Sequence, residues 1–407
     1  MHRAGCAPSG QHLRTEVPCP DHTAVIHVPD TVCATRLGIA EVNEAFAELA
    51  DALAPLFSRS DLRGNAMAYV HGLLTPGVAG NCWALAQAVG HSRPHRLQHF
   101  LAGALWDEDA ARDEVRAFVA RCLGPRGVLI FDETGDLEKG NLTAGVGRQY
   151  TGTAGRIENA VYASYATASG HALIDRELYV QADWFADANR MTAAGFPSDH
   201  AFATKPQLAR IQAERALDGG LDPACATGDE VYGRSSELRE VFERRGIGYV
   251  FAVGCDYTVT TSGYERLRAD QALWLVEPRG WNRRSCGDGS KGRRLYDWAW
   301  IATTSERHHL LIRRKLSNPS ELVYYIAYVP EHYVCSLTDL VKVAGTGWAV
   351  EDDFQNAKQA VALDRTQVRS YRGWKRHATL AMAAYAILAV AASATAIRPT
   401  PILPHDV

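Results

Sequence analysis

Two acidic residues in this chain share a local setting that suits catalysis. Asp132 ends the apolar run VLIF and is followed by ETG, and Asp229 ends the shorter run ACATG and is followed by EVYG. A run of β-forming residues closed by an acid and a glycine predicts a buried strand whose last residue emerges at its end. Open α/β folds place their sites at the carboxyl ends of neighbouring strands. The pattern therefore predicts two carboxylates at one edge of a sheet.

A third acid, Glu351, lies on the helical segment that begins near Trp348. Converging carboxylates without a nucleophilic Ser or Cys motif are the ligands that Mg²⁺ and Mn²⁺ prefer. Two such ions about 4 Å apart can hold the attacking and leaving oxygens of a phosphoryl transfer. The alternative is that each aspartate only caps the helix after it. Capping is the better explanation for either aspartate alone, whereas metal binding gains when both aspartates and the acidic helix are considered together.

The elements that must position these acids follow from the periodicity of the chain. Residues 39–124 carry apolar residues at three- and four-residue spacing, which predicts a helical N-terminal domain. Residues 125–255 and 336–398 alternate short strands with capped helices, which predicts a catalytic α/β domain with a partly parallel sheet. Residues 256–335 return to a period of two and predict an antiparallel β insertion, and residues 399–407 form a tail.

The composition is that of a globular chain without an overall basic character. Of 407 residues, 47% are hydrophobic and 22% are charged, which suffices for two or three domains. The formal net charge of −3 gives no support to a nucleic-acid partner, so any basic surface must be local. The nine cysteines form no CxxC pair, which argues against a disulfide framework or a zinc ribbon and is typical of a reducing cytoplasm.

Two segments need a separate interpretation. Residues 378–397 contain no charge, as a membrane span would, but they are dominated by alanine, which drives membrane insertion only weakly. We interpret this segment as a buried helix and expect no membrane partner. Residues 1–38 are rich in Pro, His and Cys without a sustained period, so they are predicted to form a loose extension, and no signal peptide is apparent.

Five blocks of sequence together resemble bacterial insertion-sequence transposases of the DDE, RNase H-like superfamily, the cut-and-paste type with a β-rich insertion. In chain order the blocks are FDETG, VGRQYTGTAGRIEN, TGDEVYG, KGRRLYDWAW and WAVEDDFQNAK, and the resemblance runs from about residue 60 to 390. It implies an RNase H-like mixed sheet flanked by helices. It also implies a DNA transposase that cuts and joins DNA by two-metal phosphoryl transfer.

Carried over residue by residue, the resemblance implies that Asp132, Asp229 and Glu351 are the catalytic, metal-binding triad. Asp132 would bridge two Mg²⁺ ions, with Mn²⁺ as a substitute, and the other two acids would hold one ion each. Glu351 is chosen within EDD because the family places a lysine seven positions later, where Lys358 stands. One position departs from the family, because many relatives carry an arginine where this chain has Gly347.

The implied partner is double-stranded DNA, both the transposon ends and the target. The resemblance also implies that a homodimer binds this DNA and that the protein is cytoplasmic and associated with the nucleoid. Arginine and lysine side chains would contact the DNA phosphates. A solvated surface charge is the simpler interpretation for any one of them, except in the cluster 282–294. Trp281 and Trp298 could stack on a flipped base, although Trp298 is also typical of a core. The candidates for DNA contact are Arg148, Arg156, Lys205, Lys291, Arg293, Arg294, Lys358, Lys375 and Arg376.

Two other functions are compatible with the same sequence. A domesticated or decayed transposase would bind DNA without cutting it; Gly347 and the acidic balance favour this interpretation, and the complete triad argues against it. A transposase fold recruited to small-molecule or other metal-dependent chemistry would have a smaller and less basic site. Terminal inverted repeats beside the gene would distinguish an active transposase from both.

Overall fold

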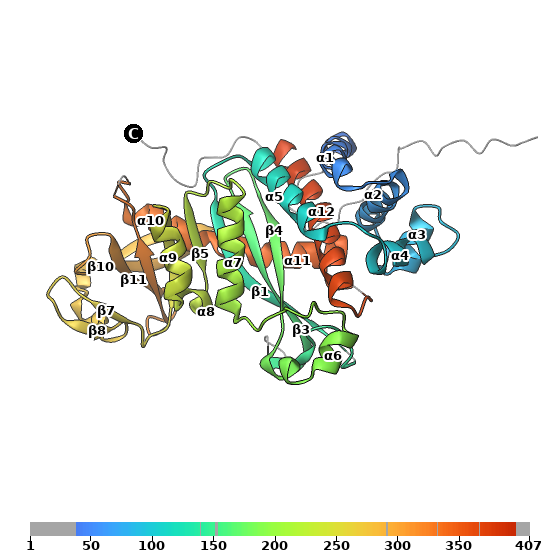
Figure 1. Ribbon diagram of the computed structural model, residues 1–407. Helices are drawn as coiled ribbons and strands as arrows, with labels where there is room; N and C mark the ends of the chain where they lie inside the picture. The colour runs from blue at the N-terminus through green and yellow to red at the C-terminus, as the bar shows by residue number, and fades with distance from the viewer. Residues whose placement is uncertain are drawn as a thin grey trace, which may run out of the picture.

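The computed structural model describes residues 38–138, 140–150, 154–289, 292–331, 333–365 and 367–395. The predicted N-terminal extension (apart from its last residue), the C-terminal tail and Lys291 lie outside this part of the chain. A mixed sheet of ten strands runs through the described residues, and helices cover both of its faces (Figure 1). This arrangement confirms the predicted fold class, an RNase H-like mixed α/β sheet flanked by helices.

The strands of the large sheet follow the order β2-β3-β1-β5-β6-β12-β11-β10-β9, and β4 pairs with β3. The pairs β1–β5 and β5–β6 are parallel, and the other pairs are antiparallel. The sheet is therefore partly parallel, as predicted. Its strands are β1 (Val128–Leu137), β2 (Gly147–Tyr150), β3 (Ala154–Ala166), β4 (His171–Tyr179), β5 (Cys225–Gly228), β6 (Gly248–Val253), β9 (Asn282–Gly289), β10 (Gly292–Ala302), β11 (His308–Lys315) and β12 (Leu322–Tyr328).

The helices divide between the N-terminal region and the two faces of the sheet. The N-terminal helices are α1 (Ile39–Leu53), α2 (Ser60–Leu74), α3 (Cys82–Ala88), α4 (His95–Ala102) and α5 (Glu108–Leu123). One face of the sheet carries α7 (Lys205–Asp218), α8 (Glu230–Gly233) and α9 (Ser236–Arg244), and α6 (Ala188–Ala193) lies beyond its end (Figure 1). The opposite face carries α10 (Leu337–Thr346), α11 (Ala349–Val361) and α12 (Tyr371–Thr395).

The β-rich residues 256–335 are antiparallel, as expected, but they extend the central sheet instead of forming a separate one. Strand β12 pairs with β6 over five residues, from Tyr324 opposite Val253 to Tyr328 opposite Tyr249. Only the short hairpin of β7 (Thr258–Thr260) and β8 (Arg266–Arg268) forms a second sheet among the described residues. The inserted strands are thus rigidly continuous with the strands that carry the two aspartates.

Helix α12 contains the apolar segment that imitates a membrane span. It is the one described helix whose length and hydropathy would suit a membrane, yet most of its apolar window is buried inside the protein. It packs against α1, α2, α5, α11 and β4. The position of α12 at the centre of this helical layer supports the prediction of a core helix, and it joins the N-terminal helices to the sheet.

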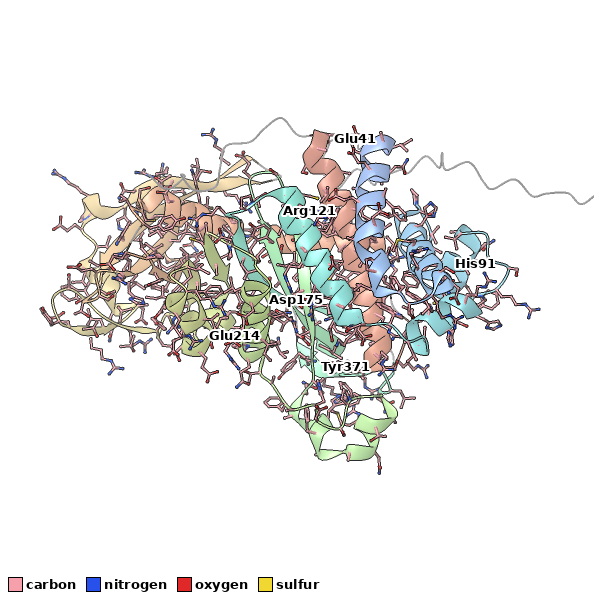
Figure 2. The ribbon with its side chains drawn as sticks, turned by 45° about the horizontal axis from the view of Figure 1, so that its top comes forward. Glu41, His91, Arg121, Asp175, Glu214 and Tyr371 are labelled. Atoms are coloured by element: carbon pink, nitrogen blue, oxygen red, sulfur yellow. The ribbon has the colours of Figure 1, made fainter. Side chains whose placement is uncertain are left out.

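Buried ion pairs hold this helical layer on the sheet. Asp175 of β4 is fully buried and accepts two hydrogen bonds from Arg215 of α7, at 2.9 and 2.7 Å. The next residue, Arg176, is also fully buried and donates to Asp109 of α5 at 3.0 Å. Figure 2 shows Asp175 between α5 and α7. Because a buried charge is costly without its partner, these pairs make the relative positions of α5, α7 and β4 specific.

The structure corrects one prediction about DNA contact. Arg376 of α12 is only 1% exposed, and its guanidinium donates to Glu108 at 3.1 Å and to the carbonyl oxygens of Phe100, Leu101 and Trp106. It therefore satisfies carbonyls at the end of α4, where a helix leaves such groups without partners. A side chain so enclosed cannot reach a phosphate, so the prediction that Arg376 binds DNA is wrong.

Arg376→Ala is expected to lower the free energy of unfolding by about 3 kcal/mol or more, because it leaves the buried Glu108 carboxylate and several carbonyls unpaired. Arg372→Ala, an exposed position one turn earlier on the same helix, should change it by less than about 0.5 kcal/mol. Urea unfolding of both variants measures the difference. Equal stabilities for the two variants would contradict the structural role of Arg376.

Candidate active site at the ends of the central strands

Asp132 and Asp229 lie side by side just beyond the point where the parallel ladder between β1 and β5 ends. The parallel ladder between β1 and β5 places Phe131 opposite Gly228, so the two aspartates are the next residues at the same level. Neighbouring strands are separated by about 4.8 Å. The structure therefore brings these two acids together, as the sequence pattern predicts. The prediction that Asp132 ends its strand is wrong, because β1 continues to Leu137 in its antiparallel pairing with β3.

Strand alternation decides which face of the sheet Asp132 occupies. Phe131 packs against Tyr232 of α8, so the side chain of Asp132 points to the opposite face. Its cross-strand partner on that face is Tyr162, whose ring lies 5.5 Å from that of Phe354 on α11. Asp132 thus faces the helix that carries the third acid.

Burial, together with the neighbouring carboxylates of Asp229, Glu133 and Glu351, raises the pKa of Asp132 to about 8, against the opposing effect of one hydrogen bond from the Glu133 backbone N–H at 2.8 Å. Burial also raises the pKa of Asp229 and of Glu351. The charged groups that most affect Asp132 are all acidic. A divalent cation would remove this repulsion, so the donor set fits such an ion.

The three acids do not form a closed cage for one ion. No group of three or more His, Cys, Asp or Glu side chains in the described part of the chain could hold a single metal ion together. Mg²⁺ commonly binds through one or two carboxylates and completes its shell with water and substrate phosphates. The arrangement therefore suits ions that are held by pairs of acids and completed by a phosphate substrate.

The alternative explanation, that each aspartate only caps a helix, applies to Asp229 and not to Asp132. Asp229 does cap α8, because its Oδ1 accepts from the backbone N–H of Val231 at 2.8 Å. Asp132 caps no helix, since β1 continues through it to Leu137. Capping accounts for one oxygen of Asp229 and leaves the buried carboxylate of Asp132 without a structural explanation.

The consecutive acids Glu351, Asp352 and Asp353 of α11 have different environments. Glu351 and Asp352 are both exposed, and Glu351 is near enough to Asp132 to affect its pKa. Asp353 is fully buried and serves as a hub, which the sequence did not predict. Its carboxylate accepts hydrogen bonds from the hydroxyls of Ser164 and Tyr385 and lies 2.6 Å from Nδ1 of His171. The hub fixes α11 to β3, β4 and α12.

Lys358 fixes the other end of α11 to the strand that carries Asp132. Its Nζ lies 2.6 Å from Oδ1 of Asp136 and donates to the carbonyl of Gly135 at 3.3 Å. Asp136 is four residues beyond Asp132 on β1. Lys358 is therefore engaged within the protein, and its contact here is structural.

Glu133 points away from Asp132, as strand geometry predicts. Its carboxylate pairs with Lys205 at 2.6 Å and accepts from the hydroxyl of Tyr232 at 2.6 Å, on the α7–α8 face. The positive charge of Lys205 also opposes the increase in the pKa of Asp229. Lys205 thus lies beside the acids, but it is already paired with one of them.

The remaining basic candidates for DNA contact differ in exposure and in whether they already form an ion pair. Arg148 and Arg156 are exposed and lie opposite each other on β2 and β3, and Arg293 is exposed on β10. Lys375 is mostly buried and forms an ion pair with Asp109 at 2.5 Å. These positions leave the first three available to a DNA backbone and Lys375 occupied.

Arg294 lies close to the third acid. Its guanidinium lies 4.4 Å from the ring centre of Trp348, and its charge opposes the increase in the pKa of Glu351. Arg313 of β11 contacts the same ring at 5.2 Å, which no sequence motif indicated. The start of α11 therefore carries two guanidinium groups on one tryptophan.

The two tryptophans proposed for base stacking have different positions. Trp298 is fully buried, so its interpretation as a core residue is right and it cannot stack on a base in this structure. Trp281 is partly exposed and is covered by the guanidinium of Arg314, 3.9 Å from its ring centre. An exposed face for stacking is therefore not apparent at either residue.

The chain is similar to known proteins over the part that contains the two aspartates. A family model described as DDE superfamily endonuclease matches residues 52–297, which include Asp132 and Asp229 and end before Glu351. A probable transposase for insertion sequence element IS701, from Microchaete diplosiphon, is 27% identical to the chain over 177 residues. The match covers 43% of this chain and 44% of that protein, so it spans less than half of either.

Proposed function

Because the chain belongs to the DDE superfamily endonucleases, we propose that it is a DNA transposase whose Asp132, Asp229 and Glu351 hold two divalent cations. Asp132 would hold the ions together with Asp229 and Glu351, and the ions would supply Lewis-acid stabilisation of charge on phosphate oxygens. Mg²⁺ is the proposed ion and Mn²⁺ its substitute. The substrate is double-stranded DNA, as transposon ends and target, bound by a homodimer in the nucleoid-associated cytoplasm.

The observation that carries the proposal is the environment of Asp132. A half-buried carboxylate that is close to three other carboxylates is unfavourable for the fold alone, as its raised pKa indicates. Natural proteins keep such unfavourable groups mainly at functional sites. Asp132 is also held by a rigid central strand, which suits a metal ligand.

The bound cations would stabilise the charge that develops on the attacking and leaving oxygens of a phosphoryl transfer. The chain's own residues hold and orient the reactants. Lys358 and the Asp353 hub fix α11, so Glu351 keeps its position relative to Asp132. Arg294, supported by the ring of Trp348, presents a guanidinium to a phosphate beside Glu351. No side chain of the protein acts as a covalent nucleophile in this scheme.

Arg294 also addresses the departure at Gly347. A Cβ added at Gly347 would lie 3.3 Å from the carbonyl oxygen of Ala344, which is a tight contact, and 3.8 Å from Thr227. We propose that Arg294 supplies the missing positive charge from β10. Arg294→Ala should then reduce cleavage about 10- to 100-fold without loss of stability, and Arg293→Ala, next to it and exposed, should have a smaller effect. Equal cleavage rates for the two variants would contradict this role.

The proposed function is tested by cleavage of DNA that carries the sequences flanking the gene. Wild-type protein should cut it with Mg²⁺ and not with EDTA, and Asp229→Ala should lose at least about a thousandfold in rate. Asp218→Ala, an exposed acid paired with Arg245, is the matched control and should cut like wild type. Cutting in EDTA, or equal cutting by Asp229→Ala, would contradict the proposal.

A further inference from the structure

Glu158 of β3 is an acid that the fold encloses without a hydrogen-bond partner. The residue is 3% exposed, and neither oxygen of its carboxyl group has a hydrogen bond of acceptable geometry within the described residues. Burial and the carboxylates of Asp136 and Glu138 raise the pKa of Glu158 well above its usual value of 4.5, and the nearby indole of Trp374 opposes them. A carboxyl group in such a place either keeps a proton or requires a cation.

Strand pairing places Glu158 beside the contact that fixes α11. It lies directly opposite Asp136 in the antiparallel pairing of β3 with β1, so both side chains point to the same face of the sheet. That face is covered by α11, because Tyr162, four residues after Glu158, packs against Phe354. Opposite residues of such a pair have Cβ atoms about 5 Å apart, so the two carboxyl groups can share one hydrogen bond. Asp136 also pairs with Lys358 of α11 at 2.6 Å.

Two other acids lie close to this pair, and each has a basic neighbour of its own. The charge of Arg369 opposes the increase in the pKa of Glu138. Nε of Arg365 lies 3.8 Å from Oδ1 of Asp364. In contrast, both charged groups that affect the pKa of Glu158 are acidic. Among the acids of this cluster, Glu158 is therefore the one whose charge has nothing to balance it.

We propose that Glu158 is a positioning residue, which keeps its proton and donates it to Asp136, so that Asp136 and Lys358 hold α11 and its Glu351 in place. The inference rests on the proposed function, because it concerns the position of a proposed metal ligand. With one proton between them, the two acids carry a single negative charge, which Lys358 balances. Without that proton, two negative charges would face one lysine on a covered face of the sheet, and their repulsion would loosen the contact with α11.

A metal ion is the other way to balance the charge of Glu158, and it fits less well. No group of three or more His, Cys, Asp or Glu side chains in the part of the chain that the structure describes could hold one. The ammonium group of Lys358 also already occupies the position beside Asp136. A bound cation is therefore kept as an outcome that the test can identify.

The proton on Glu158 makes this arrangement sensitive to alkaline pH. Burial also raises the pKa of Asp136, against the charge of Lys358, so the two acids titrate as a pair. The folded protein keeps a proton that the unfolded chain loses above the usual pKa of 4.5, so the free energy of unfolding falls as the pH rises toward the pKa of the folded state. Tyr162, on the same face, keeps its own proton, because burial raises its pKa well above 10.

The first test is urea unfolding in EDTA, in an Asp132→Asn background that removes the titration of Asp132. The free energy of unfolding should fall between pH 6 and pH 9, and adding Glu158→Gln should make this fall smaller. The glutamine amide can still donate to Asp136 but has no proton to lose in this range. Glu240→Gln, at an exposed acid of α9, is the matched control and should leave the fall unchanged. Equal falls with Glu158→Gln and with the control would overturn the proposal.

The second test is the pH profile of single-turnover cleavage with saturating Mg²⁺. The alkaline limb of the profile should move to higher pH by about one unit or more in Glu158→Gln, and should not move in Glu240→Gln. Asp136→Asn should lower the rate by about tenfold or more at every pH, because it releases Lys358 and lets Glu351 move. A change of stability in Glu158→Gln without a shift of the alkaline limb would overturn the positioning role.

The two tests also separate this inference from its alternatives. Stabilisation by Mg²⁺ that persists in Asp132→Asn and disappears when Glu158→Gln is added would indicate a cation in place of the proton, and would overturn the proposal. If wild type cuts DNA and Asp229→Ala does not, but Glu158→Gln has the profile of wild type, only the inference fails. If wild type does not cut DNA with Mg²⁺, the proposed function fails and the positioning role fails with it.

Discussion

Asp132→Asn is expected to abolish metal-dependent DNA cleavage, by about a thousandfold or more, and at the same time to stabilise the metal-free protein. The first effect follows because an amide is a weaker ligand for a hard cation than a carboxylate is. The second follows because the variant removes a buried charge that faces Asp229 and Glu351. A residue needed only for folding would not give this combination.

The stability effect of Asp132 has a defined pH dependence. The pKa of the carboxyl is about 8 in the folded protein, against an ordinary value of 3.8. Between these pH values the folded protein keeps a proton that the unfolded chain has lost, so the free energy of unfolding falls as the pH rises and the loss is complete above about pH 8. The shift corresponds to at most about 6 kcal/mol.

Urea unfolding in EDTA at pH 5 and pH 8.5 tests this dependence. The free energy of unfolding should fall more between pH 5 and pH 8.5 for wild type than for Asp132→Asn. At pH 8.5 the variant should be the more stable of the two proteins. Asp218→Asn, at an exposed acid, should follow wild type at both pH values. Lower stability of Asp132→Asn at pH 8.5, or retained cleavage, would contradict the account.

The second prediction concerns the acids of α11, which are adjacent in sequence and should give three different results when each is replaced by its amide. Glu351→Gln should lose cleavage by about a thousandfold with no loss of stability, because Glu351 is the proposed metal ligand. Asp352→Asn should change the cleavage rate by less than about threefold, because Asp352 is exposed and its side chain has no hydrogen bond or ion pair within the described part of the chain.

Asp353→Asn should instead lower the free energy of unfolding by about 3 kcal/mol, because one carboxylate accepts from two hydroxyls and contacts His171 in a fully buried site. Its cleavage rate should fall less than that of Glu351→Gln at a temperature where the variant is folded. Urea unfolding and single-turnover cleavage on the same preparations separate the effects. A thousandfold loss for Asp352→Asn, or full activity for Glu351→Gln, would contradict the assignment within EDD.

The adjacency of Asp132 and Asp229 was predictable because the signal is local, although β1 continues past Asp132 to Leu137. An apolar run closed by an acid and a glycine is visible in ten residues, whereas the parallel register between β1 and β5 is known only from the structure. Glu351 has no such signal of its own, because EDD offers three acids. Its choice depended on the family resemblance.

The Asp353 hub and the enclosed Arg376 could not be predicted from local sequence. The partners of Asp353 are Ser164, His171 and Tyr385, which are brought together only by the packing of α11 against β3, β4 and α12. Arg376 looks basic and exposed in the run YRGWKRH, yet its partners at the end of α4 lie about 270 residues away in the chain. Local composition reports charge, and tertiary packing decides whether that charge faces solvent.

The sequence also did not predict that the inserted strands are continuous with the central sheet. Antiparallel periodicity in residues 256–335 predicts strands, but it does not say that β12 pairs with β6. That pairing matters for the site, because it holds β10, and with it Arg294, in a fixed position beside α11.

The most direct test of the central claim is a change of metal preference caused by one ligand. Asp229→Cys replaces a hard oxygen ligand with a thiolate, which binds Mg²⁺ poorly and binds softer ions better. We expect wild type to cleave DNA with either Mg²⁺ or Mn²⁺. The variant should be inactive with Mg²⁺ and regain part of its rate with Mn²⁺. An unchanged ratio of the Mg²⁺ and Mn²⁺ rates in Asp229→Cys would contradict the claim that Asp229 holds a metal ion.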